Sequence, residues 1–498
     1  MTFKLTRRAL LKSAVAAAGI GDVATRFPAA ALAAPALQDR LPTPAVSRRS
    51  ALVMAQVLNR TRFADLPPAA VKHAKMIVAS TLASAASGAL LGSARIIRDL
   101  AKEHGGRSEA TIWFDGAKLP LTEASRVNAM LSDAAASDDS DLRNVAHTGT
   151  CVAATGLAIS ERTGATGPDL LNAIVVGYEA AGRIGAALAA SRGNGGGRNV
   201  HASAIVAFGG VVTAAKLLRL TDEQTAHAIG LTATTMGGLG IGTNSWAREY
   251  MAGNAALCAV NAALAASRGF TVNDDMLEAE AGYLGTIGGG KPDTQSLARE
   301  PGGEWDIVKY MAIKLVPGAH AFHSSVEAAV NASRQSGIGP EEVARILVSG
   351  AQSRTLGGNR VPRDMVEAIH SLPYFLASAV ADKDFSWAHA TPEKINRPVV
   401  ARLIGLVETD PAPGSVRYEW SWGGTVTIVT KSGARYSSTV DAPRGSGPRG
   451  IEWNDVDAKF RAMMPDSGLP ARRIEQVLNV IHDFEQLKKV SLLTGMLS

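Results

Sequence analysis

Apolar residues recur every three or four positions over long stretches of this chain, and many of them are small. The stretch after His201 carries such a series, formed by Ala204, Ile205, Phe208, Val212, Ala215 and Leu218. This spacing matches the turn of an α-helix and predicts a helix with one buried face. Only 5% of the residues are aromatic, whereas alanine and glycine are abundant. We therefore expect helices whose backbones pack closely together.

Two further helices are marked by the residues at their starts. Thr221 and Gln224 form a capping box, which predicts a helix over 223–236. The segment Gly167-Pro168-Asp169 begins another helix, because proline favours the first helical turn. Its inner face is predicted to carry Leu170, Leu171, Ile174, Val175 and Tyr178. Similar patterns continue from about residue 48 to residue 290.

The pattern changes after Glu304. A helix start at 340–342 is followed by a short predicted strand over 345–349. Apolar and polar residues then alternate between 416 and 440, with a turn at Lys431-Ser432-Gly433 between the last two strands. This arrangement predicts an antiparallel hairpin or meander.

Helical periodicity returns over 453–464 and 474–487. The order of elements predicts a mainly α protein, in which a large all-helical domain is built from both chain ends. A smaller α+β domain is inserted in it. The expected boundaries are 48–304 and 449–498 for the helical domain and 305–448 for the inserted domain.

The first residues have the features of an export signal. Arg7 and Arg8 lie in a twin-arginine motif, an apolar run follows over 14–21, and Ala31-Leu32-Ala33 matches a signal-peptidase site. We predict a signal peptide over 1–33, a linker over 34–47 and a periplasmic location. The apolar run is too short to span a bilayer, so no stable membrane insertion is expected.

Charge and cysteine content narrow the function further. The signal carries five basic residues and one acidic residue, a net +4, so the remainder keeps +2 of the chain's +6. Since no basic stripe with interleaved aromatic residues occurs, no nucleic-acid partner is expected. Cys151 and Cys258 fall inside apolar helical runs, which favours buried thiols over the alternative of a disulfide. His320 and His323 are three residues apart, unlike a helical zinc-binding pair, so neither a metal nor another cofactor is expected.

Several short motifs follow one another along the chain. They are Asp138-Asp139-Ser140 before His147, Val200-His201-Ala202 before a helix ending Lys216-Leu217-Leu218-Arg219-Leu220, Arg248 to Ala256, Lys314-Leu315-Val316-Pro317 with His323, Ser371-Leu372-Pro373-Tyr374, and Lys459-Phe460. In their order and spacing they resemble the MmgE/PrpD family, which includes 2-methylcitrate dehydratase, cis-aconitate decarboxylase and iminodisuccinate epimerase. The resemblance covers nearly all of the chain after the signal.

The resemblance implies a helical domain with an α+β lid, a site between the two, and a homodimer. It also implies proton removal next to a carboxylate of a small di- or tricarboxylate. His147, His201 and Asp138 are the implied catalytic residues, and Arg248, Lys314 and His323 the implied substrate-binding residues. Imidazole titrates near neutral pH, and cations stabilise the charge that develops on an enolate.

The chain departs from the family pattern at three places. Ala136 stands where the family has the first aspartate of its acidic motif, and the spacing to His147 is one residue longer. Asp133 or Asp138 substitutes for that acid only if the local backbone differs. Met251 replaces a histidine of the Arg248 segment, and Leu315-Val316 replace a Pro-Tyr pair.

Structural alternatives remain open for each residue type. The acidic run from Asp138 to Asp141 is also typical of a solvated loop, and His201 of a core histidine. Arg248 is compatible with a surface position, and His323 with a partner of a helix cap. Three functions follow: a 2-methylcitrate dehydratase-like lyase, a carboxylate epimerase or isomerase, and a periplasmic carboxylate-binding protein that has lost catalysis.

Overall fold

The computed structural model describes residues 49–192, 200–235, 237–302, 304–350, 352–353, 356, 361–412, 418 and 422–498. Residues Arg48–Ser498 form one compact unit. The predicted signal peptide and the linker lie outside the described residues, as does most of the predicted strand around 416–420. The export route therefore stays a prediction.

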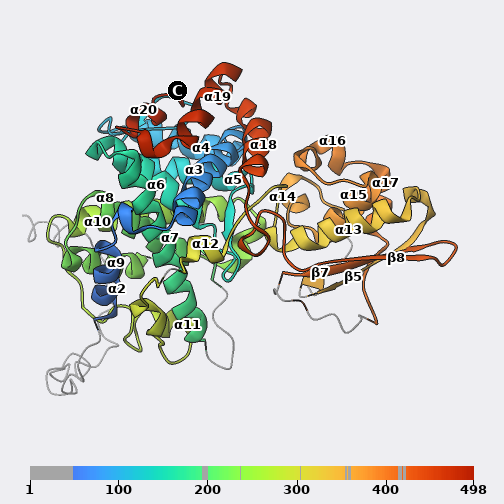
Figure 1. The fold of residues 1–498 in the computed structure, drawn as a ribbon, viewed down its shortest axis with the longest axis horizontal. Helices are drawn as coiled ribbons and strands as arrows, with labels where there is room; N and C mark the ends of the chain where they lie inside the picture. Colours follow the sequence, from blue (N-terminus) through green and yellow to red (C-terminus); the bar gives the residue numbers. More distant parts are fainter. Residues whose placement is uncertain are drawn as a thin grey trace, which may run out of the picture. The chain divides into compact units, whose positions relative to one another are not determined.

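Helices from both ends of the chain build the largest hydrophobic core (Figure 1). Near the C-terminus, α18 (Trp453–Met463) and α19 (Ala471–His482) pack against α3 (Pro68–Gly88). The other helices with residues in this core are α2 (Ser50–Asn59), α4 (Gly92–His104), α5 (Leu121–Ala134), α6 (Thr148–Thr163), α7 (Gly167–Ala190), α8 (Ser203–Leu217), α9 (Asp222–Thr235), α10 (Ala247–Ala266), α11 (Tyr283–Gly288), α12 (Asp306–Lys309) and α20 (Ser491–Thr494). The predicted mainly α fold is confirmed.

The helix starts follow the sequence signals. Thr221 and Gln224 form the predicted capping box, in which each backbone N–H donates to the other side chain. Helix α7 begins at Gly167 as predicted, with the Thr166 hydroxyl accepting from the Asp169 backbone N–H. These contacts satisfy N–H groups that a helix terminus leaves without partners.

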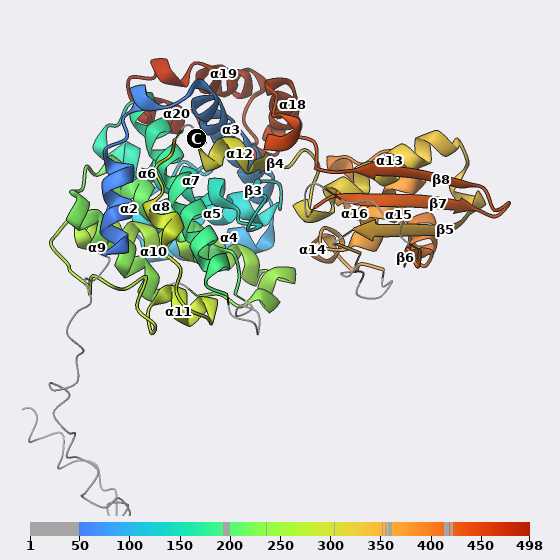
Figure 2. The same ribbon diagram turned by 60° about the horizontal axis from the view of Figure 1, so that its bottom comes forward.

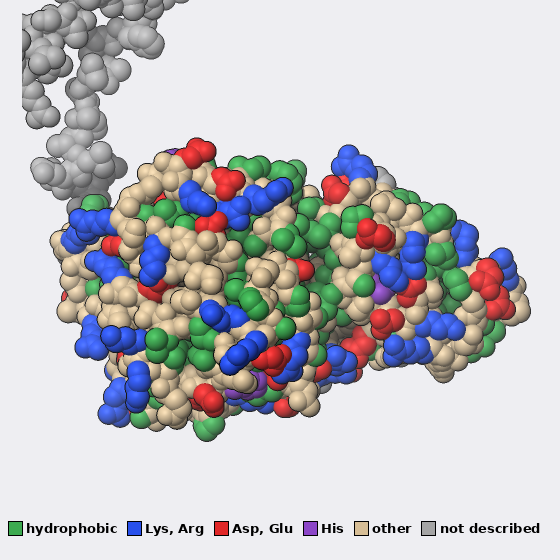
Figure 3. Space-filling view, turned by 90° about the horizontal axis from the view of Figure 1, so that it is seen from above, with side chains coloured by type: hydrophobic (Ala, Val, Ile, Leu, Met, Phe, Trp, Pro, Cys, Tyr) green, Lys and Arg blue, Asp and Glu red, His purple; other side chains and the backbone are tan. Residues whose placement is uncertain are grey.

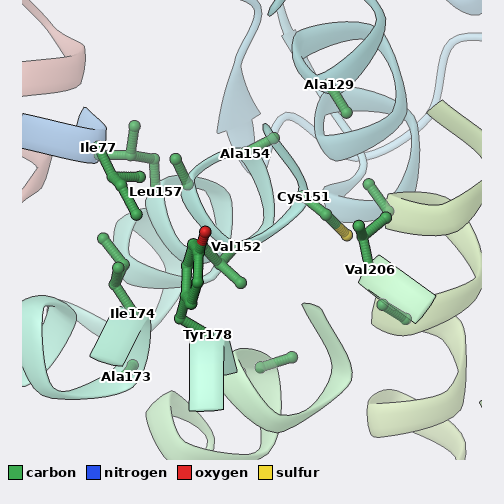
Figure 4. Close-up of a cluster of buried hydrophobic side chains, with 14 of the residues drawn as sticks. Ile77, Ala129, Cys151, Val152, Ala154, Leu157, Ala173, Ile174, Tyr178 and Val206 are labelled. Carbon is green, nitrogen blue, oxygen red and sulfur yellow. The ribbon is translucent and has the colours of Figure 1, made fainter. Parts of the chain in front are cut away.

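Helices α6, α7 and α8 pack closely at the centre of this core. Figure 4 shows Val152 and Leu157 of α6 near Tyr178 and Ile174 of α7. Cys151 lies on the side of α6 that faces α8 and is buried, whereas Cys258 is half-buried. Both cysteines are free thiols, as the sequence predicts, and burial raises the pKa of Cys151 to about 12.

The close approach of α8 to its neighbours depends on Gly210. A Cβ atom at this position would lie 2.6 Å from the Cys151 sulfur and 2.9 Å from the Ala259 Cβ of α10. We expect Gly210→Ala to lower the free energy of unfolding by about 1–3 kcal/mol, because the added methyl group overpacks the contact. This loss exceeds the stabilisation that alanine gives a helix relative to glycine. Urea unfolding measures this change. Gly92→Ala is the control, because its new Cβ would come no closer than 3.7 Å to the Trp246 ring, and an equal loss in that variant would refute the packing explanation.

A second hydrophobic core is formed by residues from the stretch Phe322–Val440. Its four-stranded sheet has the order β6-β5-β7-β8, in which only β6 runs parallel to its neighbour. Helix α13 lies along β7 and β8 (Figure 2). The elements are α13 (His323–Ser336), β5 (Val343–Gly350), α14 (Met365–Ala368), α15 (Leu372–Asp382), α16 (Pro392–Ile395), α17 (Pro398–Ile404), β6 (Val407–Thr409), β7 (Gly424–Thr430) and β8 (Arg435–Val440).

The predicted hairpin with its turn at Lys431-Ser432-Gly433 joins β7 to β8, so that prediction is confirmed. The helix start predicted at 340–342 is a single 3₁₀ turn, and α19 ends at His482 rather than at residue 487. Trp305, Met311 and Ile313 fall within the predicted lid but pack in the first core. The domain boundaries stay predictions.

Two small antiparallel pairs complete the described strands. β1 (Ala110–Thr111) pairs with β2 (Lys118–Leu119), and β3 (Asp139–Asp141) pairs with β4 (Met311–Ile313). The second pair is important because it joins the acidic motif to the segment that precedes Lys314.

Helix α7 is long and apolar enough to cross a membrane, but 83% of its most apolar 18-residue window is buried inside the protein. This burial is typical of a core helix.

On the face drawn in Figure 3, basic and acidic side chains are interspersed. That face carries no single-sign stripe of the kind that nucleic-acid binding requires.

Candidate active site

A cavity of about 430 Å³ brings together four of the six predicted site residues: His147, His201, Arg248 and Lys314. Its remaining lining is mixed, and comes from Ala136, Arg143, Asn144, Val145, Gly185, Leu188, Ala189, Arg192, Val200, Ala202, Ala204, Ile205, Gly240, Thr243, Gly318, Ala319, His320, Ala321 and His370. Volumes in this range suit small-molecule ligands. The cavity therefore has the size and the cationic groups expected for a small carboxylate.

The strand pair β3–β4 brings Lys314 to the acidic motif. Asp139 pairs with Ile313 in antiparallel register, so the residues one step beyond, Asp138 and Lys314, also meet. The Lys314 Nζ donates to Asp138 Oδ1 at 2.9 Å, and both side chains are buried. Asp138 to Asp141 are all buried, so the alternative of a solvated acidic loop is wrong.

His147 lies directly before the N-terminus of α6, next to the same acidic motif. Its Nδ1 is 2.8 Å from the Asp139 carbonyl oxygen and 3.0 Å from Asp138 Oδ2. Because a carbonyl oxygen only accepts, Nδ1 carries a proton, and in the neutral ring Nε2 keeps its lone pair. Nε2 has no hydrogen-bond partner within the described part of the chain and is therefore available to a ligand.

The N-terminus of α6 also stabilises the two neighbouring carboxylates. The Gly149 backbone N–H donates to Asp139 Oδ1 at 2.9 Å, and the Thr150 hydroxyl donates to Asp138 Oδ2 at 3.0 Å. Free N–H groups at a helix start favour negative charge. The local fold therefore favours carboxylates at this place before any substrate binds.

Burial and charge act in opposite directions on Asp138 and His147. Burial disfavours the charged form of Asp138, but His147 and Lys314 outweigh it and hold the Asp138 pKa well below 3.8. Burial also lowers the pKa of His147, but Asp138 outweighs that effect and raises this pKa above 6.5. For Asp139, burial and the Asp138 charge raise the pKa to about 7. These effects favour the ionised carboxylate of Asp138 and the protonated ring of His147.

His201 has the opposite tautomer. The Ser203 backbone N–H donates to its Nδ1 at 3.1 Å, so Nδ1 is unprotonated and Nε2–H is the donor of the neutral ring. Burial lowers the pKa of His201 to about 4, which keeps this ring neutral at pH 7. His201 can thus donate a hydrogen bond into the cavity without taking a proton.

Arg248 is the second residue of α10 and is buried, so the alternative of a surface position is wrong. Its Nη2 donates to the carbonyl oxygens of Asp133 at 2.7 Å and Ala134 at 3.2 Å, at the C-terminal end of α5. Cations suit this end of a helix. These contacts fix the guanidinium beside the cavity.

The cavity also contains residues that we did not predict as site residues. Arg143 pairs with Asp141 at 2.8 Å and Asp306 at 2.7 Å, whereas Arg192 is exposed and has no ion-pair partner in the described ranges. Burial lowers the pKa of His370 to about 3, so this ring is neutral. His370 directly precedes the Ser371-Leu372-Pro373-Tyr374 motif, and that position was the available signal.

His320 lines the cavity with both ring nitrogens buried and without hydrogen-bond partners among the described residues. His323 lines a different cavity of about 450 Å³, together with Lys459 and Trp387. Lys459 donates to the Ser80 hydroxyl and to the Ser137 carbonyl oxygen. The second bond fixes the backbone directly before the acidic motif. Burial lowers the pKa of Lys459 to about 7.

Ala136 lies at the cavity surface with a φ angle of 49°. This left-handed conformation is unfavourable for alanine by about 1–2 kcal/mol, whereas aspartate and asparagine adopt it more readily. The backbone at Ala136 therefore favours glycine, asparagine or aspartate over alanine. Aligning the family aspartate with the next residue, Ser137, does not supply an acid either. The Ser137 hydroxyl donates to the Ala135 carbonyl oxygen at 2.9 Å.

Another cavity, of about 900 Å³, is larger but contains none of the predicted site residues. Its Lys216 is engaged with three backbone carbonyl oxygens, those of Leu58, Asn59 and Thr61. Its Arg62 pairs with Asp65. Size alone therefore does not favour it as the site.

Asp133, Asp138 and His147 have ligand atoms within 4.8 Å of one another, a spacing that a metal ion would fit. However, Lys314 already pairs with Asp138, and the Arg248 Nε lies 3.5 Å from Asp133 Oδ2. Two fixed positive charges beside the same oxygens oppose a third cation. We therefore treat the group as part of an organic-anion site, and the absence of a metal stays a prediction.

The fold and the cavity define a mainly helical protein with a cationic small-molecule site. The chain belongs to the MmgE/PrpD family, since it matches the MmgE/PrpD N-terminal domain over residues 53–296 and the C-terminal domain over residues 317–483. It is 22% identical to cis-aconitate decarboxylase of Homo sapiens over 455 residues, which cover 89% of this chain and 93% of that protein. It is 24% identical to cis-aconitate decarboxylase of Mus musculus over 417 residues, which cover 80% and 83% of the two chains.

Proposed function

We propose that the protein is a lyase that acts on a small di- or tricarboxylate and uses His147 for proton transfer next to a carboxylate. The observation that carries the proposal is the ion pair of the buried Asp138 and Lys314 with the half-buried His147 beside it, since His147 and Lys314 meet Arg248 and His201 at one cavity. The two cis-aconitate decarboxylase relatives support a carboxylate substrate. Dehydration of a 2-methylcitrate-like acid is the first reaction to test.

We also propose that the enzyme is a homodimer exported to the periplasm.

In a dehydration, His147 Nε2 takes the proton next to the carboxylate, and the C–H electron pair moves into an enolate. Lys314 and Arg248 lie where they would stabilise this negative charge, and the neutral His201 donates a hydrogen bond. The enolate electrons then form the carbon–carbon double bond, and the β-hydroxyl group leaves as water with the proton that His147 took up. Return of the proton to the other face would instead epimerise the substrate.

Decarboxylation is the second candidate because the His147 pKa is raised above 6.5 by Asp138. In that reaction the C–C electron pair stays on carbon when carbon dioxide leaves, and a protonated His147 supplies the proton to this carbon. The same cations stabilise the developing charge. A histidine whose pKa is raised by a neighbouring carboxylate holds its proton more firmly and can deliver it to the developing carbanion.

The test is incubation of the full chain in heavy water with 2-methylcitrate, citrate, cis-aconitate, and tartrate- or aspartate-like diacids, followed by NMR. Deuterium exchange with water loss would support a dehydratase, and carbon dioxide loss with deuterium uptake would support a decarboxylase. Exchange without elimination would indicate an epimerase. If no acid reacts but one raises the melting temperature, the protein binds carboxylates without catalysis, and the lyase proposal fails.

Ala136→Asp separates a working enzyme from a degenerate one. We expect turnover to fall by about tenfold or more, because the new carboxylate would repel the carboxylate groups of the substrate. Repulsion between like charges a few ångströms apart costs on the order of 1–3 kcal/mol. The variant is expected to fold, because aspartate tolerates the left-handed backbone at this place. Ala136→Asn adds similar volume without charge and should lose less. A large gain of turnover in Ala136→Asp would show that the site had lost its acid.

A further inference from the structure

The carboxylate of Asp133 has an unusual environment for a buried charge. Asp133 lies in the last turn of α5 and is completely buried, and neither of its oxygens has a hydrogen-bond partner among the described residues. A buried carboxylate without hydrogen bonds is costly, and the C-terminal end of a helix disfavours negative charge further. A group kept under these conditions warrants a functional explanation.

The neighbours of Asp133 are the charged groups of the site. The Arg248 Nε of α10 lies 3.5 Å from Asp133 Oδ2, and a ring nitrogen of His147 and a carboxylate oxygen of Asp138 lie within 4.8 Å. The negative charge of Asp133 also acts to raise the pKa of His201, which precedes α8, and of Glu249, which follows Arg248. Asp133 is thus placed between the cation that faces the substrate and the histidine that moves the proton.

Two carboxylates act on His147 from different elements. Asp138 contacts Nδ1 directly, while Asp133 approaches from α5, and Lys314 opposes both. His201, His320 and His370 also line the cavity and are held neutral by burial, while Arg143, Arg192 and Arg248 are its other cations. Asp139 interacts with His147 as well, but burial and the Asp138 charge raise the pKa of Asp139 to about 7. Removing Asp133 would therefore leave Asp138 as the main carboxylate that stabilises a positive charge on His147.

We propose that Asp133 is a positioning residue of this site, whose carboxylate holds Arg248 beside the cavity and balances the positive charge on His147 when that ring carries the transferred proton. The proposal rests on the function proposed above. Asp133 does not line the cavity, so it acts through Arg248 and His147 rather than on the substrate.

The experiment compares Asp133→Asn with Glu249→Gln in the full chain without substrate, and follows the His147 ring by NMR as a function of pH. Glu249 is the matched control, because it is also buried and lies 3.9 Å from Arg248, whereas the carboxylates that raise the pKa of His147 are those of Asp138 and Asp133. In Asp133→Asn the His147 pKa should fall by about 1 unit, the effect of losing an opposite charge at this distance. In Glu249→Gln it should stay at the wild-type value.

Turnover provides the second readout. Asp133→Asn should lower kcat by about tenfold and move the acidic limb of its pH profile to lower pH by the same shift as His147. Asp133→Glu keeps the charge and should restore the titration. An unchanged His147 titration in a folded Asp133→Asn protein would overturn the proposal, as would an equal shift in Glu249→Gln.

A further measurement needs no variant. In the wild-type protein, the side-chain carboxyl carbon of Asp133 should show a step at the pH where His147 titrates, and a flat response would overturn the proposal even if Asp133→Asn failed to fold. Because both titrations are made without substrate, they test Asp133 separately from the reaction. If no carboxylate reacts, the proposed function fails, while the titration still decides the role of Asp133.

Discussion

Replacing His147 by glutamine is expected to slow proton transfer by about 10²–10⁴-fold, because the residue is the proposed proton carrier. Glutamine retains a hydrogen-bonding group but has no titratable nitrogen. In the wild type the dehydration or exchange rate should rise as the pH passes upward through the His147 pKa, which lies above 6.5. That step should vanish in the variant. Deuterium exchange followed by NMR between pH 5 and pH 9 measures both effects.

His73→Gln is the matched control for this experiment. His73 is also buried, and its Nδ1 lies 2.9 Å from the Ile307 carbonyl oxygen, but it does not line the cavity. We expect this variant to keep both the rate and the pH profile. Retention of full activity in a folded His147→Gln protein would remove His147 from the mechanism.

Asp138→Asn is expected to lower the free energy of unfolding by about 3–5 kcal/mol, because it leaves Lys314 buried without a carboxylate. The effect depends on pH in a defined way. The Asp138 pKa is lowered in the folded state, so its contribution is present above 3.8 and is lost as the pH falls through the folded value. The His147 pKa is raised, so its contribution is present below 6.5 and is lost as the pH rises through the folded value.

The difference between wild type and Asp138→Asn should therefore be largest between pH 3.8 and pH 6.5 and smaller at pH 8. Urea unfolding at pH 5 and pH 8 measures it. Glu408→Gln is the control for an exposed pair, where the loss of the Arg345 contact should cost no more than about 1 kcal/mol. The double variant Asp138→Asn/Lys314→Met should recover much of the stability, since both charges are then removed. An equal loss at the two pH values would contradict the role of His147 in this group.

The helices that could be predicted individually from the sequence have local signals. The glycine and proline at 167–168 marked the start of α7, and the Thr221–Gln224 box marked the start of α9. The alternation on either side of Lys431 likewise predicted the hairpin. Predictions of length were less accurate, as at 340–342 and at the end of α19, because hydrophobic periodicity does not show where backbone hydrogen bonding changes.

The site was predicted in part. The motifs identified His147, His201, Arg248 and Lys314, which now line one cavity, but they also suggested His323, which lines another. The sequence analysis named Asp133 only as an alternative to the missing family acid, and it did not identify His370 as a lining residue. His370 directly precedes the Ser371-Leu372-Pro373-Tyr374 motif, whereas Asp133 lies in the last turn of α5, where nothing in the sequence distinguishes it from an ordinary helix-end residue.

By itself, the sequence determined the helical class, the main helix starts, the hairpin and the residue types available for acid–base chemistry, because these depend on neighbours a few positions away. Only the tertiary structure decided which charges meet. Asp138 and Lys314 are 176 positions apart and are joined by the β3–β4 register, while Arg248 reaches the end of α5 across 115 positions. The hydrogen bonds made in this packing set the tautomers of His147 and His201, and burial together with the neighbouring charges shifts their pKa values. Both are properties of the packed protein rather than of any short segment.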